Sequence, residues 1–403
     1  MTAAWLLSRA HDVRLYEREP RLGGHAHTHD VPVGARVVPV DTGFMVFNER
    51  TYPTFVGLLA ALDVPSRQSD MSFSVRCDRC DVAYSSVELR GLFAHPRQAF
   101  TTPHLAMLAG ILRFFRTGRR VLADGSAADL TLGAFLDAGR FGESLVRHFV
   151  LPMGGAIWSA SSGTMRAFPA ESYLRFLDNH GLLATTGQPV WRTVVGGSRR
   201  YVDRIAERLG HGVRTGRAAR SVTRLDRGVS IQVGGEAPQR VDAVVVATHA
   251  DDALALLADP SARERHALSA FRYSTNPTVL HSDATYLPAR AAARASWNVS
   301  MHDCRAEDAP VSITYDLARL QGLEDAGPLL CTLNGRGEPA RVHARMLYTH
   351  PILDQEASAG QREIAAINGE RQTYYCGAHL GNGFHEDGAR SAVVVAERLG
   401  VAW

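Results

Sequence analysis

This chain contains no lysine, because all 44 basic residues among its 403 are arginine. It therefore has no lysine side chain that could form a Schiff base with a substrate or act as a general base. The arginines nearly balance 41 acidic residues, and the net charge of +3 gives no case for nucleic-acid binding. Only five cysteines are present, at scattered positions, which predicts a reducing, cytoplasmic compartment and no disulfide framework.

The sequence also lacks a hydrophobic run that could span a bilayer, for which about 20 apolar residues are needed. Its longest apolar stretch, Leu105 to Phe115, contains Arg113. Together with Arg116, Arg119 and Arg120, this stretch makes a basic amphipathic segment. We favour a helix with a solvated arginine face, and the alternative is peripheral contact with a membrane surface or an acyl chain.

The first residues predict a helix, a turn and a strand. Residues 1–10 are good helix formers that include apolar Trp5, and the alternation that follows suits a strand ending on Glu17. In a dinucleotide-binding βαβ unit, an acidic residue at the end of the second strand accepts the ribose hydroxyls, about 20 residues after G-x-G-x-x-G. Counting back by that spacing reaches Met1. We therefore expect the chain to open inside the first crossover helix, with the first strand and its loop cut away.

The middle of the chain alternates between helical and strand patterns. Gly196-Gly197-Ser198 opens an amphipathic helix, for which Ser198 is the expected N-cap. Residues 213–233 predict strands joined by a turn at Asp226-Arg227-Gly228. Residues 241–247 form a short apolar run, which fits a strand buried on both faces.

Four segments in a fixed order carry a resemblance to a known family. They are the Gly23-Gly24 pair, the Gly196-Gly197-Ser198 loop, the run at residues 241–247 and the glycine-rich segment from Gly377 to Gly388 before a last helix. In this order they resemble the flavin-containing amine oxidoreductase family. Three shorter motifs resemble a bacterial branch of NAD/FAD-binding oxidoreductases often linked to fatty-acyl modification: Gly24-His25-Ala26-His27-Thr28, Asp41-Thr42-Gly43-Phe44 and Gly383-Phe384-His385-Glu386-Asp387-Gly388.

The resemblance implies an α/β fold with two parts. The first is a Rossmann-like FAD-binding domain, without its first strand and glycine-rich loop, made of residues 1–50, 190–260 and 365–403. The second is a discontinuous α+β substrate domain. It takes residues 51–189, where the pattern is helical and irregular, and residues 261–364, where strands and loops mix.

The resemblance also assigns FAD-binding roles. Glu17, with Arg18 beside it, would hold the adenosine ribose, and Ala219 would bond the adenine through main-chain atoms. Gly23 and Gly24 would let the backbone pass close to the pyrophosphate or ribitol, where a side chain would clash. The last helix would aim its positive end at the flavin N1/O2 edge. The other residues expected near the cofactor are His25, in a position where the family usually has arginine, and Gly377, Gly383, Phe384, His385, Glu386 and Asp387.

Three motifs have competing interpretations. The alternating histidines of His25-x-His27-x-His29 could bind zinc, but we favour a cofactor segment. Cys77-x-x-Cys80 is half a zinc knuckle or a redox pair. Because Cys304 and the other two cysteines are isolated in sequence, we favour a hairpin tip with two spare thiols, and no metal site is predicted. His385-Glu386-Asp387 could be a proton relay, but its place beside a helix start favours cofactor positioning.

The family chemistry is hydride removal from a C–H bond, for which the protein supplies orientation and a dry pocket. Amine oxidases of the family place a lysine near the flavin, and this chain has none. We therefore expect an FAD-dependent desaturase or oxidase for a small apolar, fatty-acyl type of substrate, without assigning an electron acceptor or a catalytic residue. The alternatives are an amine oxidase, and a non-catalytic remnant that binds a lipid or a partner because the pyrophosphate loop is absent. Trp158, Trp191 and Trp297 fit either a pocket wall or the core.

Overall fold

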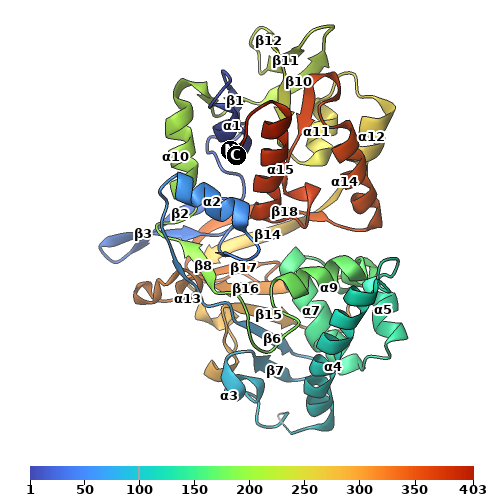
Figure 1. Cartoon of the computed structure of the whole chain (residues 1–403). Helices are drawn as coiled ribbons and strands as arrows, with labels where there is room; N and C mark the ends of the chain where they lie inside the picture. The colour runs from blue at the N-terminus through green and yellow to red at the C-terminus, as the bar shows by residue number, and fades with distance from the viewer. Residues whose placement is uncertain (99) are drawn as a thin grey trace.

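The computed structural model describes residues 1–98 and 100–403. Both ends of the chain lie side by side in the upper half of the molecule, and a large sheet with flanking helices fills the lower half (Figure 1). The rings of Trp5 and Trp403 have centroids 5.8 Å apart, which brings the two ends into direct contact.

The described residues form α-helices along the whole length of the chain. They are α1 (Thr2–Leu7), α2 (Pro53–Ala61), α3 (Glu88–Leu92), α4 (Thr102–Asp124), α5 (Leu132–Ala138), α6 (Glu143–Leu145), α7 (Leu151–Trp158), α8 (Ser162–Ala167), α9 (Ala170–Asn179), α10 (Arg199–Leu209), α11 (Ala250–Leu256), α12 (Ala262–Ser269), α13 (Leu317–Gln321), α14 (Gln355–Ile367) and α15 (His385–Arg398). A π-helical turn, η1 (Val146–Val150), joins α6 to α7.

The strands fall into one large sheet and several small ones. They are β1 (Leu15–Tyr16), β2 (Thr28–Val33), β3 (Arg36–Asp41), β4 (Phe47–Asn48), β5 (Ser66–Gln68), β6 (Phe73–Cys77), β7 (Val82–Ser85), β8 (Trp191–Val194), β9 (Val213–Arg214), β10 (Ala219–Arg224), β11 (Val229–Val233), β12 (Gln239–Val241), β13 (Val244–Val246), β14 (Arg272–His281), β15 (Trp297–Met301), β16 (Ser312–Asp316), β17 (Leu330–Leu333), β18 (Val342–Ile352) and β19 (Thr373–Tyr375).

The upper half of the molecule contains two short parallel strand pairs. β1 pairs with β9, and β13 pairs with β19. The helix and strand expected at the start of the chain are confirmed as α1 and β1, with β1 ending one residue before Glu17. α1 packs between α10 and α15, and the buried side chains of Trp5 and Leu6 anchor it there.

The apolar run at residues 241–247 is not one strand buried on both faces, so that expectation is wrong. Val241 ends β12, which pairs with β11 in an antiparallel sheet, whereas β13 starts at Val244 and pairs with β19. Exposed Asp242 lies at the break, and within β13 only Val246 is fully buried. The turn expected at residues 226–228 is confirmed, since it joins β10 to β11 and Gly228 has a φ of +76°.

The large sheet has the strand order β18-β14-β17-β16-β15-β6-β7 and is antiparallel except for the β15–β6 pair. The expectation that residues 51–189 are helical and irregular is therefore incomplete, because β6 and β7 of this segment join the sheet. Short alternating strands such as these give a weak sequence signal, and pairing with the distant β15 stabilises them. The proposed domain bounds stay a prediction.

The helices of the lower half share one core with part of the upper half. Phe114 of α4, Leu132 of α5 and Tyr173 of α9 are completely buried in it. No helix in the described part of the chain has both the length and the apolar character needed to cross a membrane.

The expected N-cap of α10 is only half right. Ser198 does stand at the N-cap position, but its side chain makes no capping hydrogen bond. Its Oγ donates to Asp41 Oδ1 at 2.7 Å, and its backbone N–H donates to Asp41 Oδ2, also at 2.7 Å. This buried carboxylate therefore joins the start of α10 to the end of β3. Sequence could not give this contact, because 157 residues separate its partners.

Candidate cofactor site

The turn at Gly23-Gly24 has the backbone shape that the sequence predicts. Both residues have positive φ, +102° for Gly23 and +58° for Gly24, a region that favours glycine. A Cβ on Gly23 would lie 2.7 Å from the carbonyl oxygen of Ala26, whereas a Cβ on Gly24 would meet nothing within 4 Å. Gly23 is therefore required by the fold, and the space beside Gly24 is open to a ligand.

Glu17 and Ala219 come together at the end of the β1–β9 pair. Backbone hydrogen bonds from Gly216 to Glu19 and from Arg217 to Glu17 fold the chain before Ala219 against the end of β1. The Glu17 carboxylate accepts one hydrogen bond, from the N–H of Glu19 at 2.9 Å. That Glu17 binds the ribose and Ala219 the adenine stays a prediction. Arg18 is instead exposed and lies 3.8 Å from Asp252.

Histidines from distant parts of the sequence gather next to the Gly23-Gly24 turn. Burial is the main reason that the pKa of His25 falls to about 3, and the nearby imidazoles of His350, His385 and His249 lower it further. Burial also lowers the pKa of His385 to about 3 and that of His379 to about 4. We call this set the histidine cluster, and its members are His25, His249, His350, His379 and His385.

Tyr348 and His350 of β18 complete one side of the cluster. The ring of His25 lies 5.1 Å from that of Tyr348 and 5.3 Å from that of His350. The Tyr348 hydroxyl is 2.6 Å from Thr42 Oγ1 and 3.0 Å from His27 Nδ1. Sequence reasoning missed both residues of β18, because they belong to no motif and β18 was assigned to the substrate domain. Burial also lowers the pKa of His350 to about 4, so this side is uncharged at neutral pH.

The three side chains at the start of α15 have separate partners. His385 stacks on Phe44 with ring centroids 3.6 Å apart, and its Nε2 lies 2.9 Å from the Tyr201 hydroxyl. The Glu386 carboxylate accepts from the N–H groups of Thr54 and Phe55 at the start of α2, at 3.0 and 2.9 Å.

Asp387 closes the start of its own helix. Its Oδ2 accepts from the N–H of Phe384 at 3.1 Å, and its Oδ1 lies 3.1 Å from Arg390. Burial raises the pKa of Asp387. Among the described contacts, no hydrogen bond links the side chains of residues 385, 386 and 387 to one another, so the geometry does not form the proton relay considered above. These residues position α15 against α2 and α10.

An aromatic wall lies beside Gly383, which has a φ of +90°. Phe384 stacks on Phe176 of α9 with centroids 4.9 Å apart, and Trp158 of α7 lies 6.3 Å from Phe384. The indole N–H of Trp158 donates to the carbonyl of Asn382 at 3.2 Å. The aromatic wall is therefore Trp158, Phe176 and Phe384, and of the three tryptophans considered from sequence only Trp158 contacts the glycine-rich segment in this way.

The residues present fit the FAD that the resemblance implies. The open space beside Gly24 admits a phosphate or ribitol near the backbone. The Nε2 atom of His25 is buried and has no hydrogen-bond partner in the described structure, which fits a polar ligand group next to the turn. The N–H of Gly377 already donates to Ser391 Oγ at 3.0 Å, so it is not free to bind the cofactor. Glu17, Gly23, Gly24 and His25 would hold the cofactor.

Comparison with solved structures shows the same fold in several enzymes. A fatty acid isomerase from P. acnes that produces CLA has a TM-score of 0.70 and 14% identity over 99% of this chain and 96% of its own. Cyclohexylamine oxidase from Brevibacterium oxydans IH-35A has a TM-score of 0.68 and 15% identity over 99% and 97% of the two chains. An oxidoreductase from Methanosarcina mazei has a TM-score of 0.64 and 12% identity over 98% and 97%.

Sequence comparisons identify the family. No curated protein matches this chain. The family model described as flavin containing amine oxidoreductase matches residues 1–281, well over half of the chain. The fold around the Gly23-Gly24 turn and the expected FAD chemistry agree with that match. This chain therefore belongs to the flavin-containing amine oxidoreductase family and is an FAD-dependent oxidoreductase.

Proposed function

We propose that this enzyme removes hydride from a C–H bond of an apolar substrate, with a fatty-acyl chain as the substrate class. When bound, FAD would accept the hydride. The aromatic wall is the observation that carries the proposal. Trp158, Phe176 and Phe384 lie next to Gly383, where the substrate would meet the cofactor, and aromatic rings of this kind bind hydrocarbon by burying it from water.

Two further observations argue against a cationic amine substrate. The carboxylates of Glu386 and Asp387, which lie nearest the aromatic wall in sequence, already bind backbone N–H groups and Arg390. The chain also has no lysine, the residue that amine oxidases of this family place near the flavin. The fatty acid isomerase from P. acnes shares the fold, as does cyclohexylamine oxidase, so fold alone does not separate the two substrate classes.

The residues of this chain would orient the substrate and exclude water. The uncharged histidine cluster and the aromatic wall would keep the reacting carbon in a dry pocket, where a polar substrate group meets imidazole rather than carboxylate. His25 Nε2 is the one buried atom of the cluster without a partner, so it would donate to or accept from the cofactor or substrate. The proton lost from the substrate would leave through a group that we do not assign.

The test is anaerobic mixing of the FAD-loaded chain with substrate. We expect an unsaturated fatty acid to bleach the flavin absorbance, and putrescine or cyclohexylamine to leave it unchanged. Bleaching by an amine and not by the fatty acid would overturn the proposal. Phe384→Ala should lower kcat/KM for the fatty acid about tenfold, because truncating this partly buried aromatic removes about 1.5 kcal/mol of apolar contact, the lower end for burying such a side chain. Tyr286→Ala, which truncates another half-buried ring, after β14 and away from both the aromatic wall and α4, is the matched control and should not change kcat/KM.

We also propose that α4 docks on an anionic membrane, from which an acyl substrate is drawn. Leu105 and Leu112 of α4 are 44% and 51% exposed. Arg116, Arg119 and Arg120 are exposed on the same helix and form no ion pair within the described residues. Anionic lipid complements this charge, and each arginine near a membrane contributes about 1 kcal/mol to binding.

Arg113, on the same helix, is not one of these unpaired arginines. Its guanidinium donates to the carbonyls of Gly139 and Arg140 and lies 4.7 Å from the centre of the Phe141 ring. With Met107 and Leu145 it lines a groove of about 370 Å³ between α4 and α6. The groove gives the apolar face of α4 a depression in which an acyl chain could lie.

Vesicle sedimentation tests the membrane proposal. We expect the protein to sediment with phosphatidylglycerol vesicles and not with phosphatidylcholine vesicles. The triple variant of Arg116, Arg119 and Arg120 to glutamine should lose most of that binding, and Arg204→Gln on α10 should not. Equal binding of the triple variant and the parent protein would exclude this face.

A further inference from the structure

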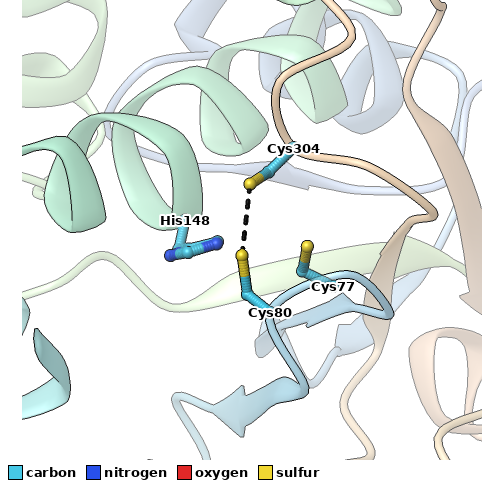
Figure 2. A group of neighbouring side chains, drawn as sticks. All are labelled: Cys77, Cys80, His148 and Cys304. Carbon is cyan, nitrogen blue, oxygen red and sulfur yellow. Dashed lines mark hydrogen bonds between the residues drawn. The ribbon is translucent and has the colours of Figure 1, made fainter.

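Three cysteines and one histidine from distant parts of the sequence converge in the lower half of the molecule. Figure 2 shows Cys77 and Cys80 on the β6–β7 hairpin, His148 on a helix and Cys304 on a loop after β15, all pointing toward one another. The four ligand atoms lie within 4.8 Å of one another. We call this set the thiol cluster. The expectation that Cys304 is isolated is therefore wrong.

The spacing of the thiol cluster matches a tetrahedral ion. The Sγ atoms of Cys80 and Cys304 are 3.6 Å apart. Two sulfurs on a tetrahedral zinc lie about 3.8 Å apart when each is about 2.3 Å from the metal. A disulfide would need the same two sulfurs at about 2.05 Å, so this distance is closer to that of two ligands than to that of a bond.

His148 supplies the second, independent observation. Its Nε2 is buried and has no hydrogen-bond partner in the described structure, and it faces the three sulfurs (Figure 2). Its Nδ1 is 3.5 Å from Ser144 Oγ, on the other side of the ring. Histidines that bind metals typically use one nitrogen for the metal and hold the ring with the other.

The backbone fixes these residues without help from a ligand. His148 lies in the π-helical turn η1, a local widening that is frequent at functional sites, and its carbonyl accepts from the Tyr84 hydroxyl of β7 at 2.7 Å. The hairpin tip is tied to the loop after β15 by Asp78 N–H to the Met301 carbonyl and Arg79 N–H to the His302 carbonyl, at 2.9 and 3.0 Å. The cluster is thus preorganised by three elements.

We propose that Cys77, Cys80, His148 and Cys304 form a structural zinc site. Thiolate and neutral imidazole are the ligands that zinc prefers, and a set of four protein ligands leaves no open position for catalysis. On binding, each thiol releases its proton to solvent and no electrons are exchanged. The resulting site carries one negative charge, which Arg305 next to Cys304 in the chain would help to offset, whereas Arg79 is already paired with Asp303 at 3.0 Å. Zinc would lock the β6–β7 hairpin, the η1 turn and the loop after β15 together.

Elemental analysis of the untagged chain, grown with added zinc and purified without chelator, tests the proposal. We expect equimolar zinc that a thiol-blocking mercurial releases. Replacing zinc by cobalt(II) should give the strong d–d and sulfur-to-cobalt bands of a tetrahedral thiolate site. Zinc-free protein with three free thiols at Cys77, Cys80 and Cys304 and no cobalt spectrum would overturn the proposal, as would a Cys80–Cys304 disulfide found by mass spectrometry.

Matched cysteine variants localise the metal. Cys304→Ala should lower zinc affinity by more than the roughly 10–100-fold that loss of a second-shell partner causes. Cys331→Ala removes another buried thiol of the same sheet and should retain equimolar zinc. If Cys304→Ala does not fold, the cobalt spectrum of the parent protein still decides. This result is independent of flavin chemistry, because the metal is measured and not the activity.

Discussion

The histidine cluster and the thiol cluster each leave one imidazole nitrogen buried and without a partner, His25 Nε2 in the first and His148 Nε2 in the second. Their surroundings differ. The ring of His25 packs at a tilt against those of Tyr348 and His350, which are neutral, whereas His148 faces three thiols. Thiols can become anions and offset the charge of a bound cation, and uncharged rings cannot. The comparison teaches that the neighbours of a buried, unpartnered nitrogen decide the class of ligand that it could bind.

Replacing one histidine of each cluster should give the largest difference in zinc affinity between the two clusters. His148→Asn removes a metal ligand and should lower zinc affinity by about 100-fold or more, the upper value for loss of a second-shell partner. His350→Asn alters the other cluster and should leave zinc affinity unchanged. Competition with a chromophoric chelator measures both. Equal zinc affinity in the two variants would mean that His148 is not a ligand.

The next largest effect is the difference in the free energy of unfolding between alanine variants of Gly23 and Gly24, which lie next to the histidine cluster. Gly23→Ala places a Cβ 2.7 Å from the Ala26 carbonyl oxygen at a φ of +102°. Such strain should lower the free energy of unfolding by about 3 kcal/mol or more. Gly24→Ala meets no atom within 4 Å and should cost only about 1–2 kcal/mol, the price of the left-handed conformation.

Flavin retention separates the two glycine variants further. If FAD occupies the space beside Gly24, Gly24→Ala should lose flavin on desalting although it stays folded in urea titrations. Flavin bound as tightly as in the parent protein would show that the cofactor lies elsewhere.

Acid should destabilise the fold in part through the histidine cluster. Burial lowers the folded-state pKa of His25 and His385 to about 3, below the value of 6.5 for the free side chain. Below pH 6.5 the unfolded chain therefore binds more protons, and stability falls as pH drops from 6.5 toward 3. Each such histidine contributes up to about 1.4 kcal/mol per pH unit.

Denaturant titrations at pH 7.5 and pH 5.5 measure this slope. His385→Gln should show a smaller loss between the two pH values than the parent protein. His11→Gln, at an exposed position near the chain start, is the control and should keep the parent slope. An unchanged slope in His385→Gln would mean that its imidazole is already charged or solvated in the folded state.

The smallest effect tests whether the acidic residues of α15 are structural. Glu386→Ala removes the carboxylate that accepts two N–H groups at the start of α2 and should cost about 1–2 kcal/mol of stability. Its FAD affinity, measured on the folded fraction, should change little. Loss of flavin without loss of stability would return Glu386 to the cofactor site, as predicted from sequence.

Much of the fold was predictable from local patterns. The first helix, the strand before Glu17, the turn at residues 226–228 and the amphipathic α10 follow from periodicity and glycine placement. The glycine turn of the site followed as well, since Gly23 and Gly24 have the positive φ that their type indicates. The β6–β7 hairpin was missed as part of the large sheet, because its partner β15 is more than 200 residues away.

The sequence by itself determined the family, the cofactor and the absence of any lysine chemistry. It did so because ordered glycine motifs and composition are local properties that need no neighbours in space. Only the tertiary structure decided which side chains meet. In the sequence, Cys77-x-x-Cys80 is only half of a metal site. In the structure, the β6–β15 pairing places Cys304 beside it and the η1 turn places His148 beside it. His385, which is expected near the flavin, stacks on Phe44, and Phe44 in turn packs against Phe55 of α2. Contacts over such separations depend on packing, which no local pattern encodes.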